Sequence, residues 1–384
     1  MLDVKKTIFH IDVNSAFLSW SAVKLLREEP GSVDLRTIPS AVAGDVNTRH
    51  GVITAKSIPA KKYGVVTGEP VVKALRKCPM LKLVKSDFNY YRQSSREFVN
   101  ILERYTDLVQ QVSIDEAFMD VTDLREICAD FETPERPFPL CLADRIRKEI
   151  REELEFTVNV GISSNKLLAK MASDFEKPDK VHTLYPEEMK KKFFPLPIGE
   201  LYGCGGQTAR RLRDLGIFTI GDAAGSSLEL LQSILGEKSG GYIYRSANGI
   251  GNTQVHPERE EAKSVSNETT MAHDITASNY EEEMPGVLQA LSESVARRLK
   301  KKEFFASTVV VMVKTNEFRR HSRQTTLRDP VQESAEIYPV AKQLMDELLT
   351  GEKGLFARGA GVRLVGVGTS GLDHGEYQQL KLEF

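Results

Sequence analysis

The sequence has few cysteines and lacks a long apolar run. Its four cysteines show no close pairing of the kind that marks a zinc site or a disulfide framework, and they fit a reducing cytoplasm best. No apolar stretch approaches the length of a membrane-spanning helix. The first residues are too polar for a secretory signal peptide. We therefore expect a cytoplasmic protein without a membrane partner.

The sequence also lacks an excess of either charge, with 52 lysines and arginines against 54 aspartates and glutamates. Overall charge therefore gives no sign of nucleic-acid binding, which has to be argued from local clusters. The length of 384 residues and the hydrophobic content of 41% are those of a soluble globular protein with several domains.

An acidic pair, Asp115 and Glu116, lies between apolar residues of strand character. This pattern predicts two short strands that meet at a tight turn with the acids at its tip. Neighbouring side chains of a regular strand point to opposite faces, so a turn is needed to bring both carboxylates together. Two like charges side by side cost free energy unless a cation offsets them, and Mg²⁺ prefers such oxygen ligands.

A lone acidic pair is more often a solvated turn than a site. A third carboxylate, Asp12, shifts the balance because it ends another apolar strand, residues 7–11. Three acids presented from adjacent strand ends are typical of a two-metal site for phosphoryl transfer.

Three segments carry a resemblance to a known family. They are residues 8–17 (IFHIDVNSAF), residues 113–118 (SIDEAF), and residues 161–170 (GISSNKLLAK) continuing to Glu176-Lys177-Pro178. In order and spacing they resemble Y-family DNA polymerases, the translesion enzymes of the DNA polymerase IV (DinB) and UmuC kind. The resemblance extends over essentially the whole chain and leaves no room for a proofreading exonuclease domain.

The resemblance implies an α/β (α+β) multidomain right-hand polymerase. The expected parts are a ferredoxin-like palm, small fingers, a helix-hairpin-helix thumb, a linker, an α+β little finger and a tail. Their expected bounds are palm 1–15 and 84–184, fingers 16–83, thumb 185–250, linker 251–262, little finger 263–373 and tail 374–384. Helices are expected at 140–154, 163–175, 281–302 and 335–349, and strands at 156–162, 263–270, 307–313 and 361–369.

The implied function is template-directed, low-fidelity DNA synthesis from dNTPs on primer–template DNA, in damage tolerance and without proofreading. Two Mg²⁺ ions would be held by the carboxylates of Asp12, Asp115 and Glu116 and by the carbonyl of Val13. Asn14 departs from the Asp-x-Asp often seen at this strand end, but the family's metal contacts do not include that side chain. We expect a monomer.

The nucleotide would be bound by residues near the start of the chain, by Lys61 and by Lys177. Phe17, five residues after Asp12, occupies the steric-gate position, although helical spacing alone would make it a core aromatic. The amides of Ser15, Ala16 and Phe17 begin a helix and suit a triphosphate. Lys61 and Lys177 match phosphate-contacting positions, the alternatives being a solvated charge pair and a helix-dipole partner.

The finger segment departs from the family pattern. Where DNA polymerase IV enzymes carry a Thr, a Tyr and an Arg that touch the triphosphate, this chain has Ala55, Ile58 and Lys61. Lysine lacks the planar fork of arginine, and Ile58 cannot donate a hydrogen bond. We therefore expect weaker or differently arranged nucleotide binding.

Three further groups are candidate contacts for DNA or a partner. The turn at Gly203 and Gly205, followed by a basic helix, fits a helix-hairpin-helix that binds DNA phosphates through backbone amides. A second basic cluster suits a sheet lying along a duplex; its members are Arg319, Arg320 and Arg323. The terminal peptide resembles the motif that binds the bacterial sliding clamp, through Gln379, Leu380, Leu382 and Phe384, although it could be only an edge strand.

Two rival functions remain open from the sequence. A non-catalytic paralogue that binds DNA and the clamp is suggested by the departures at Ala55, Ile58 and Lys61, but all three carboxylates are intact. A phosphohydrolase with Asp12 as nucleophile is disfavoured because Asn14 removes the second Asp that such enzymes use as an acid.

Overall fold

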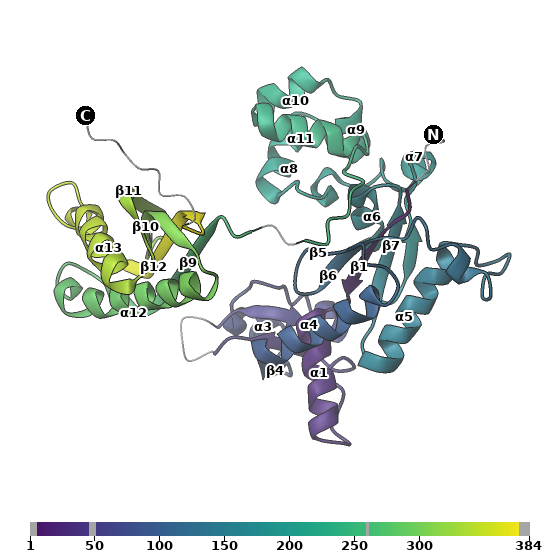
Figure 1. Ribbon diagram of the computed structural model, residues 1–384, viewed down its shortest axis with the longest axis horizontal. Coiled ribbons are helices and arrows are strands. Elements are labelled where there is room, and N and C mark those ends of the chain that lie inside the picture. Colours follow the sequence, from purple (N-terminus) through teal and green to yellow (C-terminus); the bar gives the residue numbers. More distant parts are fainter. Residues whose placement is uncertain (1–5, 46–50, 259–260, 376–384) are drawn as a thin grey trace. The chain divides into compact units, whose positions relative to one another are not determined.

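The computed structural model describes residues 6–45, 51–258 and 261–375 (Figure 1). The chain forms two compact units, a first that includes residues 6–44 and 52–258 and a second that includes residues 261–375. The clamp-like peptide, Gln379 to Phe384, lies outside the described residues. None of the described helices is long and apolar enough to cross a membrane.

A five-stranded sheet is the centre of the first unit. Its order is β5-β6-β1-β7-β8, and all neighbours are antiparallel except the parallel pair β7 and β8. The strands are β1 (Ile8–Val13), β5 (Val109–Gln111), β6 (Glu116–Asp120), β7 (Val158–Ser163) and β8 (Val181–Thr183). The central strand β1 is buried along its whole length, which its apolar composition predicts.

Helices cover both faces of this sheet. Phe9, Ile11 and Val13 of β1 share a core with α4 (Phe88–Glu103) and α5 (Leu140–Leu154). The alternate residue Ile8 packs on the opposite face against Ala169 of α6 (Lys166–Ser173). The face that carries α6 is therefore the face to which His10 and Asp12 belong.

A small three-stranded sheet, β3-β2-β4, follows the first helix α1 (Ala16–Glu28). Its strands are β2 (Ser40–Ala43), β3 (Ile53–Lys56) and β4 (Lys82–Lys85), and its short helices are α2 (Ile58–Lys62) and α3 (Val71–Lys77). Leu18 and Ala22 of α1 pack against Val42, whereas Ala41, Ile53 and residues of α2 and α3 form a separate core.

A helical part completes the first unit. Its helices are α7 (Met189–Lys192), α8 (Gly206–Arg213), α9 (Ile220–Ala224), α10 (Leu228–Leu235) and α11 (Glu237–Ala247). Leu168, Met171 and Ala172 of α6 belong to the core of this part. The helix α6 thus packs on the sheet with one face and on the helical part with another.

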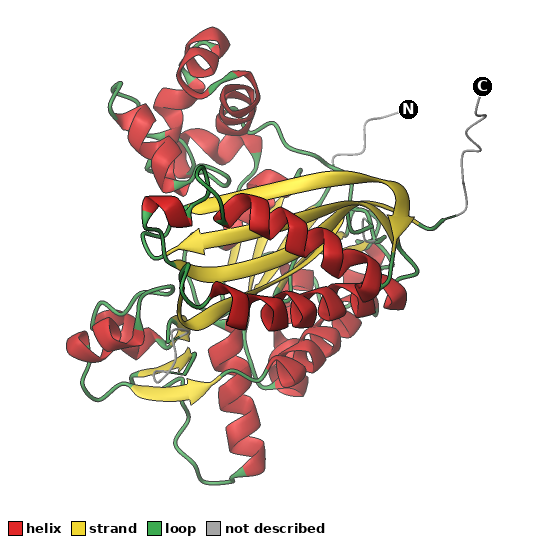
Figure 2. Ribbon diagram, turned by 90° about the vertical axis from the view of Figure 1, so that its left-hand side faces the viewer, coloured by secondary structure: helices red, strands yellow, loops and turns green. Residues whose placement is uncertain are grey.

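The second unit is a four-stranded antiparallel sheet with two helices across one face (Figure 2). The sheet order is β11-β10-β12-β9, with β9 (Ser264–Ile275), β10 (Phe305–Thr315), β11 (Arg320–Val331) and β12 (Val362–Asp373). The helices are α12 (Tyr280–Lys301) and α13 (Ser334–Leu349). Before β9, the described residues from 249 onward contain no helix or strand, as the turn-rich sequence indicates.

Most expected elements lie within a few residues of their predicted bounds. One departure has a local cause. The helix expected from residue 163 begins at Lys166, because Asn165 caps it by accepting a hydrogen bond from the Leu168 amide. The strands β10 and β12 continue past their predicted ends. β11 lies where the sequence places a sheet strand beside the second basic cluster, and its side chains are mostly exposed and polar.

The contact between β7 and α6 depends on Gly161. A Cβ at this position would lie 2.0 Å from the Ala169 carbonyl oxygen and 2.3 Å from the Ser173 nitrogen, which are backbone atoms of α6. We predict that Gly161→Ala destabilises the first unit by about 3 kcal/mol, because the helix must move away from the sheet. Chemical denaturation measures this change. Gly206→Ala is the matched control, since a Cβ at Gly206 meets no atom within 4 Å; equal stability of the two variants would contradict the prediction.

Candidate active site

Asp12 and Glu116 lie opposite each other on neighbouring strands. The antiparallel register of β1 and β6 pairs Asp12 with Glu116 and His10 with Phe118. Paired residues of adjacent strands place their side chains on the same face of a sheet. Two carboxylates that are about a hundred residues apart in the sequence are therefore neighbours.

Asp115 lies in the turn between β5 and β6, as the sequence predicts. Its carbonyl oxygen accepts a hydrogen bond of 2.9 Å from the Val13 amide, which fixes the turn to the end of β1. Its carboxylate accepts a 2.5 Å hydrogen bond from the Ser113 hydroxyl. Burial raises the pKa of Asp115, and the charges of Asp12 and Glu116 raise it further.

Glu116 contacts two residues that the sequence analysis did not single out. The His10 Nε2 atom lies 3.2 Å from Glu116 Oε2, and the Lys170 ammonium of α6 donates a 2.9 Å hydrogen bond to the same oxygen. The contacts with His10 and Lys170 lower the pKa of Glu116 to about 2. Glu116 is therefore ionised throughout the physiological pH range.

Asp12 forms an ion pair with Lys177, which also lies 2.8 Å from Asp174. Burial disfavours the charged form of Lys177, yet the attraction of Asp12 raises the pKa of this lysine. Within the described part of the chain, no three His, Cys, Asp or Glu side chains are grouped closely enough to hold a metal ion. Lysines offset the charges of Asp12 and Glu116.

A cleft of about 500 Å³ opens beside Asp12 and Asp115. All the residues predicted to bind the nucleotide line it: Ser15, Ala16, Phe17, Lys61 and Lys177. So do Val13 and the two departures Ala55 and Ile58. Glu116 instead lines a second cavity of about 280 Å³, with Lys166, Lys170 and residues of the helical part.

The ring of Phe17 is held by other aromatic rings, which come from α4. It stacks on Tyr91 with 4.8 Å between centroids and 13° between planes, and it meets Phe88 edge-on at 5.9 Å. The Tyr91 hydroxyl is 2.7 Å from that of Ser21. Both neighbours come from α4. The helical spacing of this segment is the same whether Tyr91 supports the ring of Phe17 or is an ordinary core residue, so the sequence alone could not distinguish these roles.

Comparison with known proteins identifies the family. A model of the impB/mucB/samB family matches residues 11–174, and a model of its C-terminal domain matches residues 262–382. A model described as the thumb domain of DNA polymerase iota matches residues 199–251. The DNA polymerase IV of Clostridium acetobutylicum is 41% identical over 380 residues, which cover 99% of this chain and 90% of that protein.

The chain belongs to the Y family of DNA polymerases.

Other relatives agree with this assignment. DNA polymerase IV 1 of Bacillus subtilis is 40% identical and covers 88% of this chain, which in turn covers 77% of that protein. A solved Y-family DNA polymerase chimera, Dbh-Dpo4(243-245)-Dbh, shares the fold with a TM-score of 0.77 at 24% identity, covering 95% of this chain and 99% of the chimera. The expected right-hand polymerase fold, with its thumb and little finger, is confirmed. The protein is a DNA-directed DNA polymerase of the translesion type.

The two predicted DNA-contact regions belong to different units of this polymerase. In the first unit, Gly203 adopts a positive φ of 82° and Gly205 is the N-cap of α8. A short 3₁₀ turn, Ile198–Glu200, stands where the first helix of the hairpin was expected.

In the second unit, Arg319 immediately precedes β11, and Arg320 and Arg323 lie within it. All three arginines are exposed, each within ion-pair distance of a glutamate, and such surface pairs are weak enough to exchange for phosphates.

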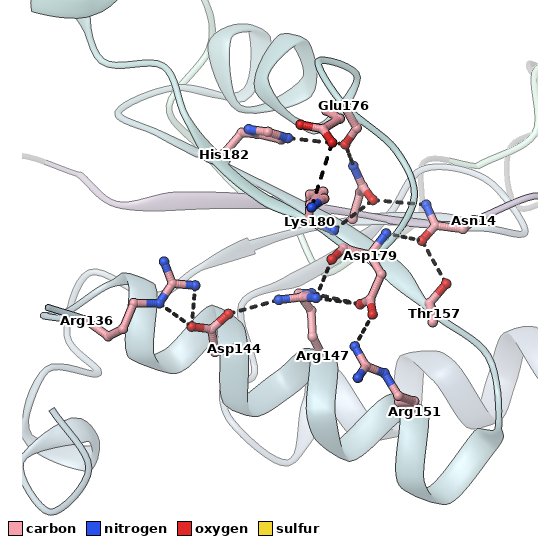
Figure 3. A network of polar contacts seen from close by, with 11 residues as sticks. Asn14, Arg136, Asp144, Arg147, Arg151, Thr157, Glu176, Asp179, Lys180 and His182 are labelled. Atoms are coloured by element: carbon pink, nitrogen blue, oxygen red, sulfur yellow. Dashed lines mark hydrogen bonds and ion pairs between the residues drawn. The ribbon is translucent and has the colours of Figure 1, made fainter. Parts of the chain in front are cut away.

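Asn14 has a structural role in this polymerase. Its amide donates to Asn159 Oδ1 at 3.1 Å, and its oxygen accepts hydrogen bonds of 2.9 Å from the Thr157 hydroxyl and from the Asp179 amide (Figure 3). Asp179 is in turn held by Arg147 and Arg151. This network ties the end of β1 to β7 and to the segment after Lys177.

We predict that Asn14→Asp lowers the free energy of unfolding by about 2 kcal/mol, because a carboxylate oxygen would then face the buried oxygen of Asn159. Asn159 cannot turn its amide without losing its hydrogen bonds to the Ser173 and Glu176 carbonyl groups. Thermal melting of the variant tests this. Asn89→Asp makes the same chemical change at an exposed position of α4, and a loss of similar size there would contradict the prediction.

Proposed function

We propose that this Y-family polymerase adds nucleotides from dNTPs to a primer 3′-hydroxyl by a two-Mg²⁺ mechanism, with low fidelity and no proofreading, in tolerance of DNA damage. One observation carries the proposal. A single cleft is lined by Asp12 and Asp115, by the Phe17 ring, and by Lys61 and Lys177. This cleft thus contains acids suited to metals, a flat ring suited to a sugar and cations suited to phosphates.

The donor atoms of these residues suit Mg²⁺ by their chemistry. The donor set consists only of oxygens, from the carboxylates of Asp12, Asp115 and Glu116 and from the Val13 carbonyl, and Mg²⁺ prefers such ligands together with substrate phosphates. When bound, the two ions would favour ionisation of the primer hydroxyl and neutralise charge on the triphosphate. The lysines that now offset Asp12 and Glu116 show that this edge of the sheet already requires positive charge.

The remaining residues of the cleft would position the nucleotide. Lys177, which is paired with Asp12, would contact the β- and γ-phosphates once Asp12 is engaged elsewhere. The amides of Ser15, Ala16 and Phe17 lie at the start of α1, where N–H groups lack partners within the helix and suit a phosphate. The Phe17 ring would lie beneath the sugar and exclude a 2′-hydroxyl.

DNA would be bound by groups that do not read its sequence. The backbone of the Gly203–Gly205 turn and the arginines Arg319, Arg320 and Arg323 would contact phosphates. The terminal peptide, from Gln379 to Phe384, would bind the bacterial sliding clamp as an extended segment. The enzyme would act as a monomer in the cytoplasm.

We predict that Asp115→Asn and Glu116→Gln each reduce primer extension about a thousandfold, because each removes a charge that holds metal at the reacting phosphate. A labelled primer on an undamaged template, with Mg²⁺ and four dNTPs, provides the assay. Primer–template affinity should stay near that of the wild type, since neither side chain is a predicted DNA contact.

Asp174→Asn is the matched control, because this nearby carboxylate does not line the cleft, and it should retain most activity. Extension that persists in Asp115→Asn would refute the metal assignment. A wild-type protein that binds DNA but extends no primer, even with Mn²⁺ and clamp, would favour the non-catalytic paralogue, which the changes at Ala55, Ile58 and Lys61 suggest.

We predict that the selectivity for deoxynucleotides depends on Tyr91 as well as on Phe17. Phe17→Ala should raise ribonucleotide insertion relative to deoxynucleotide insertion at least about tenfold, because the ring that blocks the 2′-hydroxyl is gone. Tyr91→Leu should raise it in the same direction, because the stacked support of Phe17 is lost. Single-nucleotide insertion kinetics with dATP and ATP measure both ratios.

Tyr91→Phe is the control, since it keeps the stacked ring and removes only the hydroxyl contact with Ser21. Its sugar discrimination should match that of the wild type. Unchanged discrimination in Phe17→Ala would remove the gate role altogether.

A further inference from the structure

Two lysines lie on the wall of the cleft formed by the small sheet. Lys56 is the last residue of β3, and Lys61 lies on the short helix α2 that follows. Both line the 500 Å³ cleft, together with Thr67. Lys61 was predicted to contact phosphate, whereas Lys56 was not singled out from the sequence.

Ser57 fixes the turn between β3 and α2, which separates the two lysines. Its hydroxyl accepts hydrogen bonds from the Ala60 amide at 3.0 Å and from the Ser40 amide at 3.1 Å, and it donates to the Ile38 carbonyl at 2.8 Å. The strand and the helix therefore meet at a set angle. The backbone of β3 and α2 therefore holds Lys56 and Lys61 on the same wall.

Lys56 has no carboxylate partner among the described residues. Its ammonium donates to the Thr67 hydroxyl at 3.2 Å. Glu69 is the acid whose charge raises the pKa of Lys56. Its carboxylate already accepts hydrogen bonds of 2.7 Å from Lys77 and from the Val66 amide. Partial burial and the charge of Lys61 lower the pKa of Lys56, and the charge of Glu69 opposes this shift.

Unbalanced positive charge in a cleft favours an anionic ligand. The other lysine of the cleft, Lys177, is paired with Asp12 and Asp174, and Lys170 beside it is paired with Glu116. Among the described residues, neither Lys56 nor Lys61 has an ion-pair partner, and the opposite wall carries the acids Asp12 and Asp115. A ligand with several linked phosphates satisfies both walls at once, whereas a single phosphate of a DNA backbone does not.

We propose that Lys56 is a triphosphate-binding residue, which supplies the phosphate contact that the fingers of this polymerase lack at Ala55, Ile58 and Lys61. The proposal rests on the polymerase function proposed above. Ile58 offers no donor, and Lys61 offers a point charge instead of a planar fork. Lys56 adds a second point charge on the same wall, so that two ammonium groups take the place of one guanidinium and two hydroxyls.

The test is single-nucleotide insertion of dATP opposite template dT by the full chain with Mg²⁺. Lys56→Met should raise the KM for dATP about tenfold with little change in kcat, because it removes one charge-assisted contact that is made before and during the reaction. Lys56→Arg should restore the KM to within about threefold of the wild type. Lys62→Met is the control and should leave the KM unchanged, because Lys62 lies next to Lys61 on α2 but outside the cleft.

A second measurement separates phosphate binding from catalysis. Inorganic triphosphate, which has neither base nor sugar, should bind Lys56→Met about tenfold more weakly than wild type when titrated calorimetrically with Mg²⁺. If Lys56→Met does not fold, Lys56→Gln takes its place in both measurements.

The outcomes for the two proposals differ. Wild-type insertion together with an unchanged KM and unchanged triphosphate affinity in Lys56→Met would overturn the role of Lys56 alone. An equal loss of kcat in Lys56→Met and Lys56→Arg would also overturn it, because this would indicate a structural role. A wild type that binds inorganic triphosphate through Lys56 but inserts no nucleotide would support this inference and overturn the polymerase function.

Discussion

The antiparallel register of β1 and β6 is the constraint on which the site depends. It places Asp12 directly opposite Glu116, and the bond from the Val13 amide to the Asp115 carbonyl places the third acid at the same edge. A shift of one residue would move Glu116 to the other face of the sheet. Both faces of β1 are buried, and such a shift would move Phe9, Ile11 and Val13 out of the core that they share with α4 and α5. Hydrophobic burial thus aligns the reactive groups.

Concentrating negative charge at one edge of a sheet has an energetic cost, and the fold offsets it with lysines from outside the sheet. Lys170 reaches Glu116 from α6, and Lys177 reaches Asp12 from the segment that follows this helix. Both lysines keep raised pKa values despite burial. Glu116, whose pKa is lowered to about 2, is therefore ionised before any metal or nucleotide arrives.

Local patterns predicted the strands, the acidic turn and the family, because each depends on residues close together in the sequence. Asp12 and Glu116 could be recognised in this way. Contacts that arise only when elements pack together could not be recognised from the sequence. Lys170 reaches Glu116 only because α6 packs on the sheet. Tyr91 has the spacing of any core aromatic in an amphipathic helix. The bounds of the strand at residues 320–331 could not be predicted, because an exposed, polar strand lacks hydrophobic alternation.

The two-sided packing of α6 has a mechanical consequence. One face of this helix touches β7 at Gly161 without any intervening side chain, and Leu168 and Met171 belong to the core of the thumb. The helix can neither tilt nor slide without disturbing both neighbours. A displacement of the thumb helices would therefore also displace Lys170, and with it the hydrogen bond to the carboxylate of Glu116. The position of the thumb and the alignment of Glu116 are in this way linked through the eight residues of α6.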